Sequence, residues 1–212
     1  MKAAGTFHQA GVSDSEILCE DCEKKFSEFD RYGWEILGPM AVDRPPPDSK
    51  ADTYVYKIDC DTDKLRRFIL SVLWRASVSK NPFYSAVNLG PYETTVRTRL
   101  FNPRPLSKDE FQTVAMILET GALEKYDGVL FQPFKARSPD GLIAHVLFLP
   151  GGLKFTVITG HGNFPAMRQT YVMSEPNFFL LLPCPKRFMR EVNFVPAMIA
   201  KMRRAERRAG AK

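Results

Sequence analysis

The chain has 212 residues, of which 44% are hydrophobic and 25% charged, a balance typical of a globular protein with a substantial core. Its longest apolar runs, such as residues 178–182, are far shorter than the roughly 20 residues that a membrane-spanning helix needs, so we expect no membrane partner. Residues 1–9 lack the apolar core of a secretory signal, which favours a cytoplasmic location with reduced cysteines.

The first predicted element is a helix capped by Ser13 or Ser15. Its acidic first turn suits the positive end of the helix dipole, and apolar residues then recur at helical spacing. We expect this helix to end near Gly33 or to continue, with an interruption, to Leu37. A glycine and a proline at residues 38–39 are predicted to stop it.

A proline-rich linker over residues 44–48 and a short strand over residues 54–58 come next. Capping oxygens at residues 61–63 are expected to start a helix over residues 64–79. This helix is apolar almost all the way round, which predicts that it is largely buried. Pro91 suits the first position of a third helix, which we expect to run to Leu100. The polar points of the second helix are Arg66, Arg67, Ser71, Arg75 and Ser79.

The pattern then changes to short apolar runs of period two separated by turns, which predicts an antiparallel sheet. Strands 129–134, 143–149 and 154–159 are expected to form a three-stranded meander, because turn signals separate them. A final basic helix is expected over residues 196–209. The two remaining strands are expected at residues 113–118 and 177–182.

These elements predict an α+β fold with an N-terminal helical half, an antiparallel sheet and a basic C-terminal helix. Residues 1–105 form the helical region, and residues 106–212 form the sheet region with the C-terminal helix. We interpret the two regions as one continuous domain.

The net charge of +6 is unevenly distributed along the chain. Residues 186–212 contain nine basic and two acidic side chains, whereas residues 13–30 contain seven acidic and two basic ones. A basic terminal segment is typical of proteins that bind nucleic acid or another polyanion. The alternative interpretation is a solvated, partly frayed helix.

Cys19 and Cys22 form a Cys-x-x-Cys pair, the most chemically specific motif in the sequence. One tetrahedral zinc ion can accept both thiolates, but a closed structural site needs two further ligands. Cys60, Cys184 or a histidine are the candidates, and none has diagnostic spacing. The alternative is that Cys22 packs as a small hydrophobic residue while Cys19 is partly exposed. Zinc is the only cofactor that the sequence indicates.

Enzymatic activity has little support in the sequence. His161 lies between two glycines that would allow a ligand to approach closely, so it is the one catalytic candidate. No nucleophile motif accompanies it, and a turn histidine is more often structural. His145 alternates within a predicted strand and is interpreted as structural. Phosphate-binding loops, dinucleotide fingerprints and zinc-protease motifs are absent from the sequence, so we favour a protein that is not an enzyme.

Trp74 and Arg75 stand out on the second helix, because an arginine on an apolar helix must reach either solvent or an acidic partner. We expect Arg75 to pair with Glu93 and so to bridge two helices. Glu93 and Arg97 also have the spacing of an intrahelical ion pair, which would compete for that carboxylate. The alternative is that Arg75 lines a pocket that binds phosphate or carboxylate.

Four segments of the chain carry a resemblance: residues 17–23, residues 29–33, residues 68–79 and residues 89–93, with Arg97 following. Together they resemble a family of uncharacterised bacterial proteins. In that family, an upstream Cys-x-x-Cys pair and a histidine segment are similar to the treble-clef metal core of HNH endonucleases. The resemblance covers about the first half of the chain and implies no known activity.

The chain departs from this family pattern because it begins after the upstream cysteine pair and the histidine segment. An HNH nuclease needs a histidine base and metal ligands on one small frame, and residues 1–12 supply only His8. The resemblance therefore implies either a shortened, noncatalytic relative or a true start upstream of Met1. We favour the first.

The sequence as a whole predicts a noncatalytic accessory protein, of bacterial or phage origin, that binds nucleic acid or a nucleoprotein. A metal-dependent HNH-like nuclease is the first alternative, and a protein–protein interaction module that uses exposed aromatic residues is the second. The residues expected to contact phosphate are Lys201, Arg203, Arg204, Arg207 and Arg208.

Overall fold

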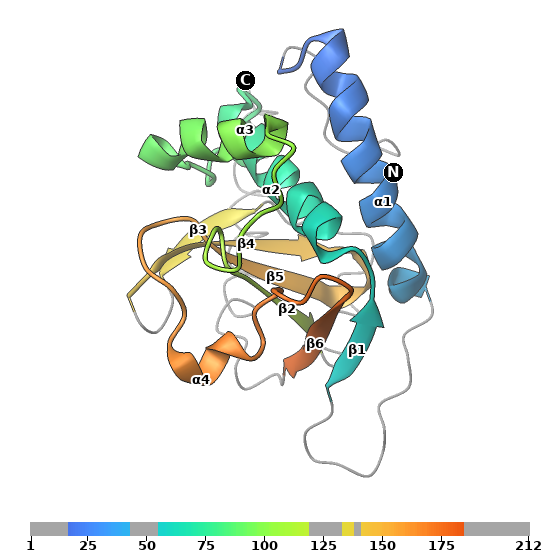
Figure 1. The fold of residues 1–212 in the computed structure, drawn as a ribbon. Helices are drawn as coiled ribbons and strands as arrows, with labels where there is room; N and C mark the ends of the chain where they lie inside the picture. Colours follow the sequence, from blue (N-terminus) through green and yellow to red (C-terminus); the bar gives the residue numbers. More distant parts are fainter. Residues whose placement is uncertain (1–16, 43–54, 119–132, 138–140, 185–212) are drawn as a thin grey trace, which may run out of the picture.

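The computed structural model describes residues 17–42, 55–118, 133–137 and 141–184, and it has an α+β fold (Figure 1). None of the helices in these ranges is long and apolar enough to cross a membrane. The elements, in chain order, are α1 (Glu20–Val42), β1 (Tyr56–Asp59), α2 (Thr62–Val78), η1 (Pro82–Tyr84), η2 (Gly90–Tyr92), α3 (Glu93–Phe101), β2 (Thr113–Leu118), β3 (Phe134–Arg137), β4 (Ile143–Leu149), η4 (Pro150–Gly152), β5 (Leu153–Ile158), α4 (Ala166–Gln169) and β6 (Phe178–Cys184).

The six strands form one sheet in the order β1-β6-β2-β5-β4-β3. The predicted meander is confirmed, because β4 pairs antiparallel with both β3 and β5. The prediction of a wholly antiparallel sheet is wrong in one place, since β2 and β6 are parallel, with Ala115 opposite Leu181. The long connection after β5 allows β6 to enter between β1 and β2, an arrangement that periodicity cannot reveal.

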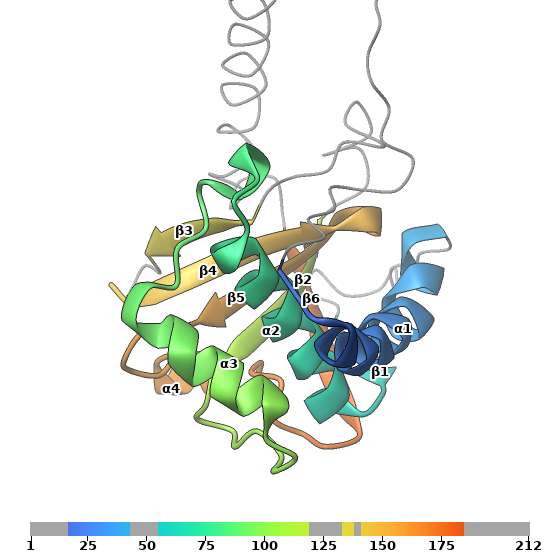
Figure 2. The same ribbon diagram turned by 90° about the horizontal axis from the view of Figure 1, so that it is seen from above.

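The helices α1, α2 and α3 cover one face of this sheet (Figure 2). Alternate strand residues point toward them, so Leu153, Phe155 and Val157 of β5 join the main core, whereas Ile158 belongs to a second cluster on the opposite face. Phe164 and Val172, which flank α4, contribute to that second cluster. The sheet is therefore buried on both faces over its central strands.

Helix α2 is the central helix, and its start agrees with the prediction. The Asp61 side chain caps it by accepting a hydrogen bond of 3.1 Å from the Lys64 amide. Leu65, Ile69 and Leu73 of this helix are completely buried. The third helix is also confirmed, since Pro91 lies in a short 3-10 turn that leads directly into α3.

The predicted limits of the first helix are wrong. Helix α1 begins at Glu20, directly after Cys19, and it runs through Gly33, Gly38 and Pro39 to Val42. A proline inside a helix removes a hydrogen bond, but Leu37 and Met40 in the same turns are buried, and burial outweighs the local preference. A methyl group at Gly33 would overlap the Phe68 ring, so this glycine permits the close packing of α1 on α2 rather than ending the helix.

Two further predictions need correction or lie outside the described residues. The second sheet strand was expected at residues 129–134, whereas β3 occupies Phe134–Arg137, and residues 129–132 are not described. The predicted caps Ser13 and Ser15, the proline-rich linker and the C-terminal basic helix also lie outside the described residues.

Candidate functional site

The cysteine pair lies at the exposed N-terminal end of α1. The Cys19 carbonyl accepts the first helical hydrogen bond, 2.9 Å from the Glu23 amide, so Cys19 occupies the capping position and Cys22 lies in the first turn. Cys19 is exposed and Cys22 is partly exposed. Hydrogen bonds from the Cys22 amide and thiol lower the pKa of Cys19, while the same thiol contact, together with burial, raises the pKa of Cys22.

The zinc ligands proposed from the sequence do not come together among the described residues. No group of three or more cysteine, histidine or acidic side chains within those ranges is placed to hold a metal ion. Cys60 lies after β1, with its sulfur 3.8 Å from the Thr62 hydroxyl, and Cys184 is buried at the end of β6. Zinc binding by Cys19 and Cys22 therefore stays a prediction that needs two ligands from elsewhere.

The expected bridge between Arg75 and Glu93 is wrong. Arg75 instead makes a bidentate ion pair with Asp30 of α1, at 2.9 Å and 2.5 Å. Its Nε also donates to the Ser71 carbonyl at 3.3 Å, which holds the guanidinium against its own helix. Phe26 of α1 stacks on Trp74, the neighbour of Arg75, so α1 passes over this part of α2 and Asp30 is the carboxylate within reach. Arg75 therefore joins α1 to α2.

Trp74 has the same structural role. It is buried, and its ring stacks on Phe26 of α1 with 5.7 Å between centroids and 4° between planes. Arg97 lies on the exposed surface of α3, where its positive charge acts to lower the pKa of the Cys22 thiol and so opposes part of the rise described above.

Two other arginines of α2 are buried and bind main-chain carbonyls of the segment that follows α3. Arg67 donates to the carbonyls of Asn102 at 2.9 Å and Arg104 at 2.6 Å, and its Nε pairs with Asp63 at 2.7 Å. Arg66 donates to the Ser107 carbonyl at 3.0 Å and to that of Glu110. We call residues 102–110 the clamped segment, because these side chains fix its path.

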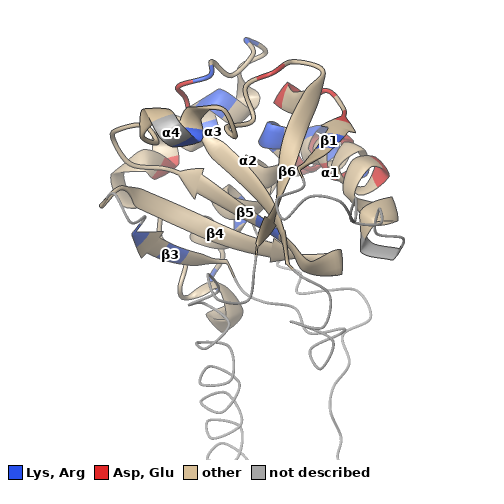
Figure 3. Cartoon of the chain, turned by 90° about the horizontal axis from the view of Figure 1, so that it is seen from below, with Lys and Arg blue, Asp and Glu red and all other residues tan. Residues whose placement is uncertain are grey.

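The Glu110 carboxylate completes the clamp. It accepts hydrogen bonds from the Ser107 amide at 2.8 Å and from Arg99, whose Nε lies 2.7 Å from it. Burial raises the pKa of Glu110, but these hydrogen bonds and the charges of Arg99 and Arg104 outweigh burial and lower it. Figure 3 shows basic residues along α2 and α3, and the buried ones among them serve this clamp.

Neither described histidine has the surroundings of a catalytic base. His161 is exposed after β5, where its ring meets the edge of Tyr92 at 5.5 Å. His145 is buried on the helix-facing side of β4, with Nδ1 2.9 Å from the Thr159 hydroxyl. Burial, helped by the charge of Lys135, lowers the pKa of His145 to about 4, so it is neutral near pH 7. His145 is structural, as its position in the sequence suggested.

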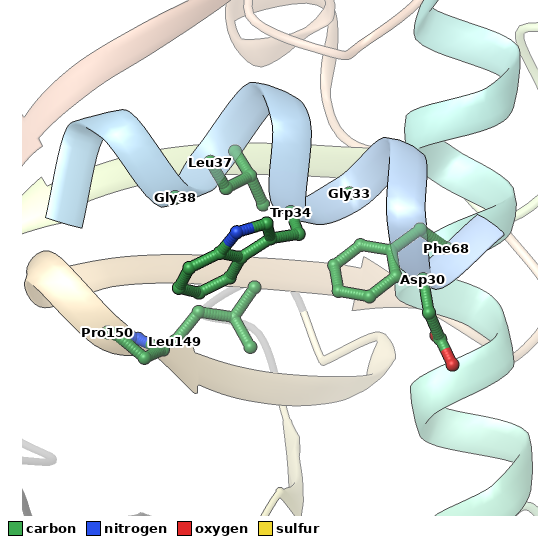
Figure 4. Close-up of a pocket in the computed structure, with 8 residues that line it drawn as sticks. All are labelled: Asp30, Gly33, Trp34, Leu37, Gly38, Phe68, Leu149 and Pro150. Carbon is green, nitrogen blue, oxygen red and sulfur yellow. The ribbon is translucent and has the colours of Figure 1, made fainter. Parts of the chain in front are cut away.

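An apolar groove lies between α1 and the β4–β5 hairpin (Figure 4). Its volume is about 160 Å³, and Trp34 forms one wall although 68% of this residue is exposed. A side chain at Gly38 would press against the Trp34 ring, so the glycine leaves room for the ring to lie along the helix. The other lining residues are Asp30, Gly33, Leu37, Phe68, Leu149 and Pro150.

Comparison with known protein families, curated proteins and solved structures finds no match to this chain. The resemblance to HNH-like proteins therefore stays a prediction.

Sequence reasoning missed Asp30 and Trp34. Asp30 follows Phe26 by one helical turn, so both lie on the face of α1 that meets α2, and this shared face was the signal that could have paired Asp30 with Arg75. Trp34 lies off the stripe that contains Phe26 and Leu37, and a large aromatic residue on the polar side of a helix is a signal of a surface function.

Proposed function

We propose that the protein is a noncatalytic accessory protein that binds nucleic acid or a nucleoprotein through Arg203, Arg204, Arg207 and Arg208, together with Lys201. The observation that supports this proposal is the use of the buried arginines. Arg66, Arg67 and Arg99 bind carbonyls and carboxylates inside the molecule. These three arginines are therefore not available to a polyanion. Residues 186–212 have the largest excess of positive charge in the sequence.

The two described histidines differ in their access to a ligand. His145 is buried, and burial lowers its pKa to about 4. His161 is exposed beside Tyr92, so the nicking assay below tests it as a base.

Binding of fluorescent duplex DNA and RNA, measured by anisotropy over a series of salt concentrations, tests the proposal. Each phosphate contact adds about 0.9 to the slope of log K against log salt on B-form DNA. Replacing the arginines 203, 204, 207 and 208 by glutamine should reduce both affinity and slope. The matched control makes the same replacement by glutamine at four exposed cations among the described residues, and it should change the slope much less. These cations are Lys24, Arg31, Lys57 and Lys64.

Equal slopes for these two variants, or no binding by the wild type, would contradict the proposal. Magnesium- or manganese-dependent nicking of plasmid DNA by the same preparation, abolished in His161→Ala, would instead support the HNH-like alternative.

The groove beside Trp34 favours a second candidate function, the binding of a partner protein. Helix α1 carries six acidic and three basic side chains, and Asp30 lies at the edge of the groove. The complementary occupant is a partner segment with an apolar side chain flanked by basic residues, which could also contact the Trp34 face. Trp34 itself reports binding: a leucine peptide flanked by arginines should shift its fluorescence to shorter wavelength, and a glutamate-flanked peptide should not.

A further inference from the structure

We propose that Cys19 and Cys22 form a redox-active dithiol, which exchanges with disulfides and closes reversibly to an intramolecular disulfide. The substrate class is a small disulfide, such as glutathione disulfide, or an exposed protein disulfide. This inference is independent of the proposed nucleic-acid binding.

The geometry of the first turn of α1 carries the proposal. The Cys19 carbonyl accepts the first helical hydrogen bond, 2.9 Å from the Glu23 amide, so Cys19 caps α1 and Cys22 follows three residues later in the first turn. Residues with this spacing at a helix start lie within the Cα separation that a disulfide bridges, about 4.4–6.8 Å. Closing the bond therefore needs little backbone movement, in contrast to a pair that must be brought together from distant elements.

Exposure assigns different roles to the two thiols. Cys19 is exposed and can be reached by an incoming disulfide, whereas Cys22 is partly covered. Cys19 is therefore the attacking thiol and Cys22 the resolving one. Cys60 lies beside Asn177 at the start of β6, and Cys184 lies at the other end of that strand, so these two thiols are apart from each other.

The reaction balances with glutathione disulfide as the oxidant. The Cys19 thiolate attacks one sulfur, a Cys19–glutathione bond forms, and the first glutathione leaves as a thiolate. The Cys22 thiolate then attacks the Cys19 sulfur, which forms the Cys19–Cys22 bond and releases the second glutathione. The two protons from the cysteines end on the two glutathione thiols, so the protein loses two electrons and glutathione disulfide gains them.

The test is equilibration of the full chain with graded ratios of glutathione to glutathione disulfide under anaerobic conditions. After acid quenching and alkylation, intact mass and peptide mapping should show a Cys19–Cys22 crosslink that dithiothreitol reverses, while Cys60 and Cys184 remain alkylated. Cys22→Ser should accumulate the glutathione adduct on Cys19, because the resolving thiol is gone. Cys19→Ser should react at least tenfold more slowly, and Cys60→Ser, the matched control, should behave like the wild type.

Three outcomes would overturn the proposal. The first is that both thiols stay reduced at oxidising ratios, and the second is that Cys19 crosslinks to Cys60 or Cys184. The third is that the purified chain holds one zinc ion per molecule, which keeps both thiols protected at those ratios. Far-ultraviolet circular dichroism of the serine variants checks that α1 still forms, so that loss of the helix is not mistaken for loss of a thiol.

Discussion

The two halves of α2 hold their neighbours in different ways. In the first half, Arg66 and Arg67 are buried and bind the carbonyls of the clamped segment. In the second half, Trp74 and Arg75 hold α1 through a stacked ring and an ion pair that solvent still reaches. Arginine therefore has two roles in this helix: in the first half it is a buried hydrogen-bond donor to main-chain carbonyls, and in the second half it forms a partly exposed ion pair with α1.

The difference in burial between Arg67 and Arg75 should determine how much each arginine contributes to the free energy of unfolding. Removing a buried charge leaves partners that water cannot reach, whereas removing a partly exposed one leaves partners that water can solvate. We therefore expect the first half of α2 to be much more sensitive to substitution than the second. Five predictions test this comparison.

Arg67→Met should have the largest effect. It leaves Asp63 and several carbonyls of the clamped segment without their donor, so we expect the free energy of unfolding to fall by about 3–5 kcal/mol. Arg75→Met, the matched control in the second half, should lower it by only about 1 kcal/mol. Urea unfolding measures both. Arg67→Lys keeps the charge but lacks the several N–H donors of the guanidinium, so its loss of unfolding free energy should be intermediate. Equal losses for Arg67→Met and Arg75→Met would contradict the proposed difference between the two halves of α2.

Gly33→Ala tests the close packing of α1 on α2. Overlap with the Phe68 ring should cost about 1–3 kcal/mol, more than the gain of about 1 kcal/mol from replacing a helical glycine. In a Phe68→Ala background the overlap disappears, so the same substitution should become stabilising. A substitution that destabilises both backgrounds equally would show that Phe68 is not the cause.

A double-mutant cycle on Asp30 and Arg75 should give a coupling energy of about 1 kcal/mol. Both side chains are partly exposed, so solvent screens their attraction despite the bidentate geometry. The coupling should decrease in high salt. A value of 3 kcal/mol or more, on the order expected for a buried pair, would mean that this half of α2 resembles the first.

The clamp should weaken in acid because the folded state lowers the pKa of Glu110. The ordinary value is 4.5, so near that pH the unfolded chain binds more protons than the folded one. This contribution to stability is complete above pH 4.5 and is lost as the pH falls through the lower folded-state pKa. Urea unfolding between about pH 6 and pH 3 should show it, and Glu110→Gln should remove that part of the acid dependence.

The fold class and most elements were predictable from the sequence because burial and turn residues leave local signals. Strands β2 and β4 begin and end at the predicted residues, and Asp61 marked the start of α2. The end of α1 was not predictable, because Gly33 lies against the Phe68 ring of α2, a contact between distant residues that local patterns do not contain.

The candidate site was predictable only in part. The cysteine pair is recognisable from spacing alone, but its position at the capping end of α1 depends on where the helix begins. Arg67 was expected as a polar point, and its burial could not be inferred, since its partners are carbonyls of a segment more than 30 residues later. Every residue has a main-chain carbonyl, so the sequence does not show which carbonyls accept hydrogen bonds from a distant arginine.

Trp34→Ala should have the smallest effect, because most of this side chain is already in solvent. We expect the free energy of unfolding to change by less than about 0.5 kcal/mol, whereas Trp74→Ala should lower it by about 3–5 kcal/mol. The chain has only these two tryptophans, so each single variant isolates the fluorescence of the other. Acrylamide should quench Trp34 strongly and Trp74 weakly. Weak quenching of Trp34 would mean that its face is covered in solution, and the apolar groove beside it would then be closed to a partner.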